Sequence, residues 1–328
     1  MKRRQHGAAL LSAMLTVTLV ATFAAAALWQ QYRSIEVEAS ERARVQVAWL
    51  QVGALDWSRL ILRIDGRAGT TDHLAEPWAV ALQESRLSTF LAADKNNTGG
   101  MTAEESVDAF LSGQMVDAQS HLNIYNLVDA GKVSEPDKAA FTKLFTLLDL
   151  PLTELDTLVT NYKSAADITV VNGAAPLMPQ RVRQLTWLGL RASTVTKLMP
   201  FVVLLPERTT VNLNTAPAEV IYATVPKLQL ADAKSAVTRR DSAHFASIED
   251  AAKAVPAMAG QLNAAQHSVA TRFFEVLGRL RLEQTVVEEQ SLVQRDNFGN
   301  VRTIWRERAV VSSPEPSTST SSTGLPPT

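Results

Sequence analysis

The chain has no cysteine among its 328 residues, which excludes disulfides, thiol nucleophiles and cysteine-ligated metal centres. It has almost no excess of charge of either sign, because 32 basic and 33 acidic side chains give a net charge of −1. This balance offers no electrostatic basis for binding nucleic acid. Its five histidines form no HExxH motif, and the sequence contains no Gly-x-Ser-x-Gly or phosphate-loop motif. We therefore expect a protein that is not an enzyme.

Charge is also missing from a long stretch near the N-terminus. No Asp, Glu, Lys or Arg occurs between Arg4 and Arg33, and residues 8–29 form an apolar run of 22 residues. As a helix this run would be about 33 Å long, which is enough to cross the hydrocarbon core of a bilayer. Lys2, Arg3 and Arg4 precede the run, which predicts a cytoplasmic N-terminus with the rest of the chain on the other side.

Two interpretations of this segment are open. A cleavable signal peptide would have an apolar region of about 7–15 residues and a small-residue cleavage site, which residues 24–27 could supply, although this run is longer. The alternative is a retained anchor, because the basic leader that ends at Gly7 before Ala8 resembles the class III leader of type IV pilins and pseudopilins. That resemblance implies cleavage by a prepilin peptidase between Gly7 and Ala8, followed by N-methylation of Ala8.

The fifth residue after that cleavage point is Ser12. Most pilins and pseudopilins have Glu at this position, where it pairs with the amine of a neighbouring subunit. A carboxylate inside a membrane is costly unless it is paired, and Ser12 cannot make this pair. The chain thereby resembles the K-type minor pseudopilins of type II secretion systems, which depart from Glu at this position.

Residues 34–64 contain no proline and a single glycine, which predicts that the helix continues out of the membrane. Apolar residues recur there at helical spacing: Val45, Ala48, Trp49, Val52 and Leu55. We expect this face to pack on the chain's own domain, and we predict that Val45, Trp49 and Val52 also bind partner subunits.

The most distinctive soluble motif is Asn-x-Asn-Thr-Ala at residues 212–216, where we expect Thr215 to cap a helix that has Pro217 in its first turn. Residues 209–256 also resemble the helix-hairpin-helix of DNA-uptake proteins. Their turn, residues 225–230, lacks both glycines of that module, and Pro226 removes a backbone donor. We predict a structural relative that lacks the phosphate site and binds no nucleic acid.

Isolated polar residues elsewhere invite catalytic or metal-binding interpretations. Asp117 and Asn123 lie in a segment that resembles the K-type family, and we expect both to hold turns through hydrogen bonds to the backbone. The family usually carries an acidic loop to which calcium binding has been attributed, but residues 159–167 offer one acid and one asparagine, and the polar turn 94–102 lacks the spacing of a calcium loop. We predict no metal and no cofactor, although calcium is possible in the family.

The patterns together predict an α+β fold. A long N-terminal helix, transmembrane in its first part, packs on a small antiparallel sheet that carries a large inserted all-α domain. The expected segments are a leader at 1–7, a transmembrane helix at 8–29, a core at 30–128 and 271–310, an insertion at 129–270 and a disordered Ser/Thr/Pro-rich tail at 311–328.

The resemblance runs from about Met1 to Arg308. It implies a bacterial inner-membrane protein with a periplasmic soluble part, acting at the tip of the pseudopilus in protein export across the outer membrane. The implied partners are the I-type and J-type minor pseudopilins, the prepilin peptidase and the inner-membrane secretion platform. The alternative is a minor pilin of a DNA-uptake or type IV pilus-like system, with a DNA-binding helix-hairpin-helix.

Overall fold

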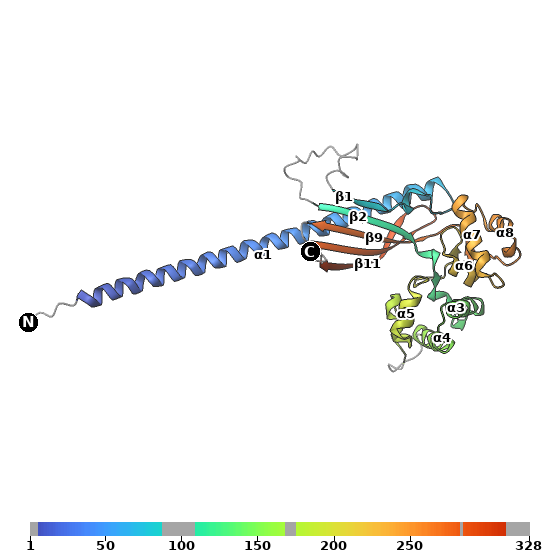
Figure 1. Cartoon of the computed structure of the whole chain (residues 1–328), viewed down its shortest axis with the longest axis horizontal. Helices are drawn as coiled ribbons and strands as arrows, with labels where there is room; N and C mark the ends of the chain where they lie inside the picture. The colour runs from blue at the N-terminus through green and yellow to red at the C-terminus, as the bar shows by residue number, and fades with distance from the viewer. Residues whose placement is uncertain (1–5, 87–108, 168–174, 283–284, 313–328) are drawn as a thin grey trace, which may run out of the picture. The chain divides into compact units, whose positions relative to one another are not determined.

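A computed structural model describes residues 6–86, 109–167, 175–282 and 285–312 (Figure 1). The chain separates into two units, residues 1–53 and 54–328, and helix α1 (His6–Ala68) runs from the first into the second. Within the described residues, α1 is the one helix that is long and apolar enough to span a membrane, with a stretch of mean hydropathy 2.0 whose side chains are all exposed. The prediction of one continuous helix is confirmed, and this helix extends to Ala68, four residues beyond the stretch 34–64 over which it was predicted.

Helix α1 buries a different face from the one predicted. The buried positions are Val47, Gln51, Leu55, Ser58 and Leu62, whereas Val45 and Trp49 are 55% and 70% exposed. The expectation that Val45 and Trp49 pack on the chain's own domain is therefore wrong, although it holds for Leu55. The buried stripe of α1 contains two polar residues, Gln51 and Ser58. A prediction based on the spacing of apolar residues therefore selected a different stripe.

Five strands form one antiparallel sheet in the order β1-β2-β9-β10-β11. The strands are β1 (Leu82–Arg86), β2 (Ala109–Asp117), β9 (Phe273–Leu282), β10 (Thr285–Arg295) and β11 (Val301–Ser312). Strands β2 and β9 are neighbours, with Asp117 opposite Phe274, although a long segment of chain separates them. A turn at residues 296–300 joins β10 to β11, and β11 continues past the expected boundary at residue 310.

The segment between β2 and β9 is the insertion (Figure 1). Its helices are α3 (Glu135–Leu147), α4 (Leu152–Ala166), α5 (Ala192–Leu198), α6 (Ala218–Thr224), α7 (Leu230–Ser242) and α8 (Ile248–Ala254), with a 3₁₀ helix, η4 (Val182–Leu188). It also contains three two-stranded pairs: β3 (Leu122–Asn123) with β6 (Val202–Val203), β4 (Val128–Asp129) with β5 (Lys132–Val133), and β7 (Val211–Asn212) with β8 (His267–Ser268). The insertion is thus mainly helical rather than all-α.

The insertion begins earlier than residue 129. Leu122, Ile124 and Leu127 belong to its hydrophobic core, so the polypeptide leaves the sheet directly after Asp117. The segment that follows Asp117 consists of short turns, so its sequence has no periodicity from which the start of the insertion could be predicted. The polar turn 94–102 and residues 313–328 of the expected tail lie outside the described residues.

Two further hydrophobic clusters hold the second unit together. Leu55 and Leu62 of α1 pack with Phe274, Val293 and other residues of the sheet. Trp78, which is fully buried, meets the ring of Phe274 edge-on with centroids 5.1 Å apart. On the insertion side, Val203 and Leu205 pack with Phe273 and Leu292 of the sheet. Full burial of each such side chain contributes about 1.5–3 kcal/mol.

Candidate functional site: a buried polar junction

The Asn-x-Asn-Thr-Ala motif converges on a carboxylate at the end of β2. Asp117 Oδ2 accepts hydrogen bonds from Asn212 Nδ2 at 2.8 Å and from Thr215 Oγ1 at 2.6 Å. Its Oδ1 accepts from the backbone N–H of Gln119 at 2.7 Å, which confirms the prediction that Asp117 holds a turn. Burial raises the pKa of Asp117 to about 6, against the opposing effect of hydrogen bonds from Thr215, Thr271 and Asn212.

The predicted role of Thr215 is wrong. Pro217 occupies the N-cap position of α6, and the Thr215 hydroxyl donates to Asp117 instead. A buried carboxylate needs donors, and this one finds them in a motif about a hundred residues further along the chain. Asn123 does hold a turn as expected, because its Oδ1 accepts from the N–H groups of Tyr125 and Leu205.

A buried arginine, Arg295, lies next to the group formed by Asp117 and the Asn-x-Asn-Thr-Ala motif. Arg295, the last residue of β10, donates to Asp65 Oδ2 at 2.9 Å and to Asp72 Oδ1 at 2.5 Å. Asp72 Oδ2 also accepts from the N–H of Thr271, and the carbonyl of Asp72 accepts from Asn212 Nδ2. Asp72 therefore connects the loop after α1 to both the sheet and the motif of the insertion.

Close packing around Arg295 depends on a glycine. A Cβ placed on Gly66 would lie 2.8 Å from Arg295 Cδ, which is closer than carbon atoms approach in folded proteins. The last turn of α1 therefore has room for the guanidinium because residue 66 has no side chain.

Three carboxylates of this region could in principle offer oxygen ligands to a metal, because Asp65, Asp72 and Glu76 each place one oxygen within 4.8 Å of the others. The Arg295 guanidinium donates to two of them, and Glu76 accepts from Trp78 Nε1 at 2.7 Å. Burial, followed by the neighbouring carboxylates, raises the pKa of Asp65. The arrangement fits a carboxylate cluster that is balanced by a cation of the chain itself.

Two imidazoles meet beside this cluster. His73 and His244 stack with ring centroids 3.8 Å apart and an angle of 11° between the planes. His244 lies in the loop between α7 and α8, and Asn214 fixes this loop by bonding to both the N–H and the carbonyl of Phe245. Burial, and then the charge of His244, lowers the pKa of His73.

The ammonium group of Lys143 binds the turn between α6 and α7. Lys143 Nζ donates to the carbonyls of Tyr222, Val225 and Pro226 at 2.5, 2.6 and 3.1 Å. These carbonyls lie at the C-terminal end of α6, where a positive charge is stabilising. A phosphate site in a helix hairpin uses N–H groups instead, so this arrangement is consistent with a hairpin that has a structural role.

The residues singled out from the sequence lie in a different unit from the junction. Gly7, Ala8 and Ser12 are part of the first turns of α1, and Ser12 Oγ donates to the carbonyl of Ala9 at 2.9 Å. Val45, Trp49 and Val52 lie further along the same unit, with Val52 half-buried. Arg295 and its carboxylate partners were not predicted, since no local pattern relates residues 65, 72 and 295.

The architecture defines the class of protein. A long apolar N-terminal helix packs through its C-terminal part on an antiparallel sheet, and a domain is inserted between two neighbouring strands of that sheet. This is the architecture expected of a pseudopilin with a large insertion. Residues 211–271, which contain the motif, match the family model described as type II secretion system (T2SS), protein K. Over these residues the chain resembles the K proteins of type II secretion systems.

Two individual proteins support this resemblance. The chain is 25% identical over 343 aligned residues to the type II secretion system protein K of Pseudomonas aeruginosa, with 97% of each chain covered. Its fold is similar to that of a chain in the crystal structure of the GspK-GspI-GspJ complex from the type 2 secretion system of enterotoxigenic Escherichia coli. That match has a TM-score of 0.63 at 17% identity and covers 82% of this chain and 98% of the other.

Proposed function

We propose that this protein is a minor pseudopilin that occupies the tip of the pseudopilus, where it starts or caps assembly together with I-type and J-type minor pseudopilins. The observation that carries the proposal is the insertion between β2 and β9. A domain of this size, fixed to the sheet through buried hydrogen bonds and charge pairs, would clash with a subunit stacked above it. The tip is the position in a helical stack that has no such neighbour.

The exposed face of α1 supports a helical partner. Val45, Trp49, Trp57, Leu60 and Ile64 recur along this face and are between 39% and 70% exposed, while the opposite stripe is buried. Gly53 lies within the exposed stripe, and a Cβ there would meet no atom within 4 Å. An apolar stripe of this length on a helix is typical of a docking face for another helix. The E. coli relative was crystallised with GspI and GspJ, which makes pseudopilins of these two types the expected occupants.

Purification of the detergent-solubilised chain with its I-type and J-type partners tests the proposal. We expect a stoichiometric complex that Trp49→Glu or Val52→Glu disrupts, because a charge would have to be buried at the interface. Val80→Glu is a matched control, since Val80 is 68% exposed and lies outside α1. Labelled protein distributed along the pseudopilus shaft would contradict the tip position.

Processing of the N-terminus is the second part of the proposal. We infer cleavage between Gly7 and Ala8 by a prepilin peptidase, methylation of Ala8, and insertion in the inner membrane with the soluble part in the periplasm. Mass spectrometry of the mature protein should identify methylated Ala8 as the first residue, and Gly7→Val should block cleavage because a side chain would hinder close approach of the peptidase. Cleavage near Ala27 would instead indicate a signal peptide.

Ser12 offers a further test of position. Its hydroxyl is bonded within the helix, so replacing it leaves no buried partner without a hydrogen bond. Assembly should therefore tolerate Ser12→Ala. A strong assembly defect in this variant, with normal membrane insertion, would mean that Ser12 contacts a neighbouring subunit directly.

The rival function in DNA uptake is tested separately. The arrangement of Lys143 at the α6–α7 turn and the net charge of −1 support the absence of nucleic-acid binding. Mobility-shift assays at moderate salt should detect no complex with duplex DNA. Micromolar, salt-dependent binding that Lys143→Gln abolishes would favour the uptake function.

A further inference from the structure

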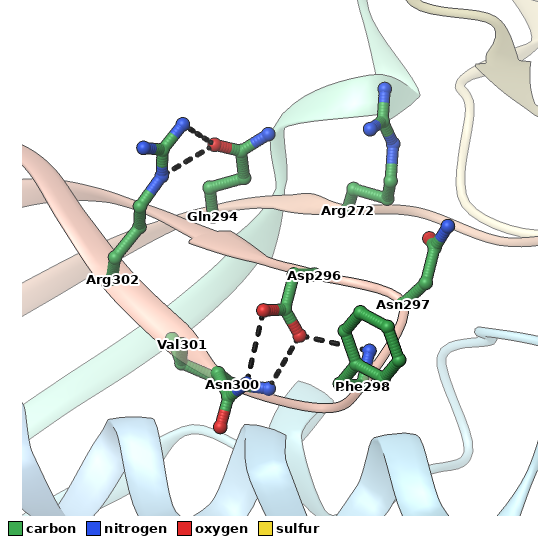
Figure 2. A pocket seen from close by; sticks show the side chains of 8 residues that line it. All are labelled: Arg272, Gln294, Asp296, Asn297, Phe298, Asn300, Val301 and Arg302. Carbon is green, nitrogen blue, oxygen red and sulfur yellow. Dashed lines mark hydrogen bonds between the residues drawn. The ribbon is translucent and has the colours of Figure 1, made fainter.

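The turn that joins β10 to β11 is held rigidly by one side chain. Asp296 Oδ1 accepts from the N–H groups of Phe298 and Asn300 at 2.9 and 2.7 Å, and its Oδ2 accepts from Asn300 Nδ2 at 3.1 Å (Figure 2). Gly299 adopts a φ of +78°, which the turn requires. The phenyl ring of Phe298, in this turn, is 85% exposed.

The turn borders a hollow of about 480 Å³ that two guanidinium groups line, those of Arg272 and Arg302 (Figure 2). Arg302 donates from Nε and Nη2 to the side-chain oxygen of Gln294, at 2.9 and 2.6 Å. This acceptor is a neutral amide, so Arg302 is oriented without being neutralised, and its remaining N–H groups are free to bind a ligand. Asp296, which lines the same hollow, is a carboxylate whose charge interacts with that of Arg302.

The nearby carboxylates are already engaged. Glu207 forms a 2.7 Å ion pair with Arg272 and accepts from Gln294 Nε2. Asp296 accepts hydrogen bonds from its own turn, and the bond from the Asn300 side chain is the main cause of its lowered pKa, to which the charge of Arg302 also contributes. Arg67 of α1 lies against the same turn, close to Gly299, and adds a further positive charge. An excess of positive charge therefore surrounds an exposed phenyl ring.

We propose that this hollow binds an acidic peptide segment of another protein, with a carboxylate on Arg302 and an adjacent apolar side chain against Phe298. Guanidinium groups bind carboxylates through paired N–H donors, and these charge-assisted bonds are among the stronger ones. Phe298 supplies apolar area beside them. The site lies at the β10–β11 turn of the sheet, next to the last turns of α1, and it does not depend on the position of the subunit in the pseudopilus.

A fluorine-labelled, end-blocked peptide with a Glu-Phe-Glu centre tests the proposal against the full chain in nanodiscs of neutral lipid, with empty nanodiscs as the blank. Ligand-observed ¹⁹F NMR should detect binding that weakens at least tenfold in Arg302→Gln and in the Gln-Phe-Gln peptide. Arg302→Lys should weaken binding less, because the charge remains while the paired donors are lost. Phe298→Ser should also weaken it.

Arg279→Gln is the matched control, because Arg279 is a half-exposed arginine of β9 that faces Glu288 at 3.7 Å. Its binding should be unchanged. Equal binding of the two peptides, or an equal loss in Arg279→Gln, would overturn the proposal. Displacement of the peptide by inorganic phosphate at equal concentration would also overturn it, since the hollow would then be a general anion site. Unfolding temperatures of all variants establish that the fold is retained.

Discussion

Arg295 and Asp72 form a charge pair in which both side chains are nearly out of contact with water: Nη2 donates to Oδ1 at 2.5 Å, and the side chains are 10% and 2% exposed. A buried ion pair adds little compared with apolar residues of the same size, but removing one partner leaves the other charge buried and uncompensated. Separation of the loop after α1 from the sheet would therefore leave buried charges unpaired and destabilise the second unit.

Replacing the cation should be strongly destabilising. Arg295→Met leaves Asp65 and Asp72 unpaired, so we expect the free energy of unfolding to fall by about 3–5 kcal/mol. Urea unfolding followed by tryptophan fluorescence measures this loss. Arg279→Met removes a half-exposed pair and should cost at most about 1 kcal/mol. Equal losses in the two variants would mean that the junction contributes no more than a surface contact.

Two glycines of α1 should respond in opposite ways to the same change. Gly66→Ala places a methyl group 2.8 Å from Arg295 Cδ and should destabilise the fold by about 1–3 kcal/mol. Gly53→Ala meets no atom within 4 Å and should stabilise the helix by about 0.8–1 kcal/mol. Thermal unfolding of both variants tests this difference, and a stabilising Gly66→Ala would show that Arg295 can move without cost.

Asp117 should give the stability a specific dependence on pH. Its pKa rises from 3.8 to about 6 on folding, so between these values the folded chain binds more protons than the unfolded chain. The contribution of Asp117 to the free energy of unfolding is complete below pH 3.8. It is lost as the pH rises through about 6, which lowers that free energy by about 3 kcal/mol. Asp117→Asn should remove this part of the dependence. Unfolding free energies of both proteins from pH 4 to 7 measure it, and parallel curves would contradict it.

The histidine pair should be coupled. Burial and then His244 lower the pKa of His73, while Asp65 and Asp72 oppose the shift. The lowered pKa of His73 therefore contributes stability at neutral pH, and this contribution is lost as the pH falls below 6.5. In His244→Gln the pKa of His73 should rise, as measured by NMR titration of the imidazole. His121, whose pKa is lowered by burial, is an internal control that should not change.

Local patterns predicted much of the fold. The apolar run and the absence of proline predicted α1. Asp117 and Asn123 were correctly predicted to hold turns, since each side chain accepts from the backbone N–H two residues further on. Helices and turns of this kind depend on hydrogen bonds between residues close together in the chain. Their presence can therefore be predicted from short stretches of sequence.

The junction could be predicted only in part. The motif at 212–216 and Asp117 stood out separately, but nothing in the sequence joined them, and Thr215 was assigned to a cap that Pro217 occupies. Lys143, on α3, gave no signal of its role at the α6–α7 turn. A side chain that bonds to groups far along the chain follows no local periodicity.

The sequence by itself determined that a long apolar helix precedes a soluble α+β domain, and its motifs were sufficient to indicate a type II secretion minor pseudopilin. Only the tertiary structure decided which stripe of α1 is buried, where the insertion leaves the sheet, and which cation balances Asp65 and Asp72. The physical reason is that burial and charge pairing are properties of surfaces brought together by folding. A polar residue such as Gln51 can lie in a buried stripe when tertiary packing encloses it, and no count of apolar residues along the helix contains that information.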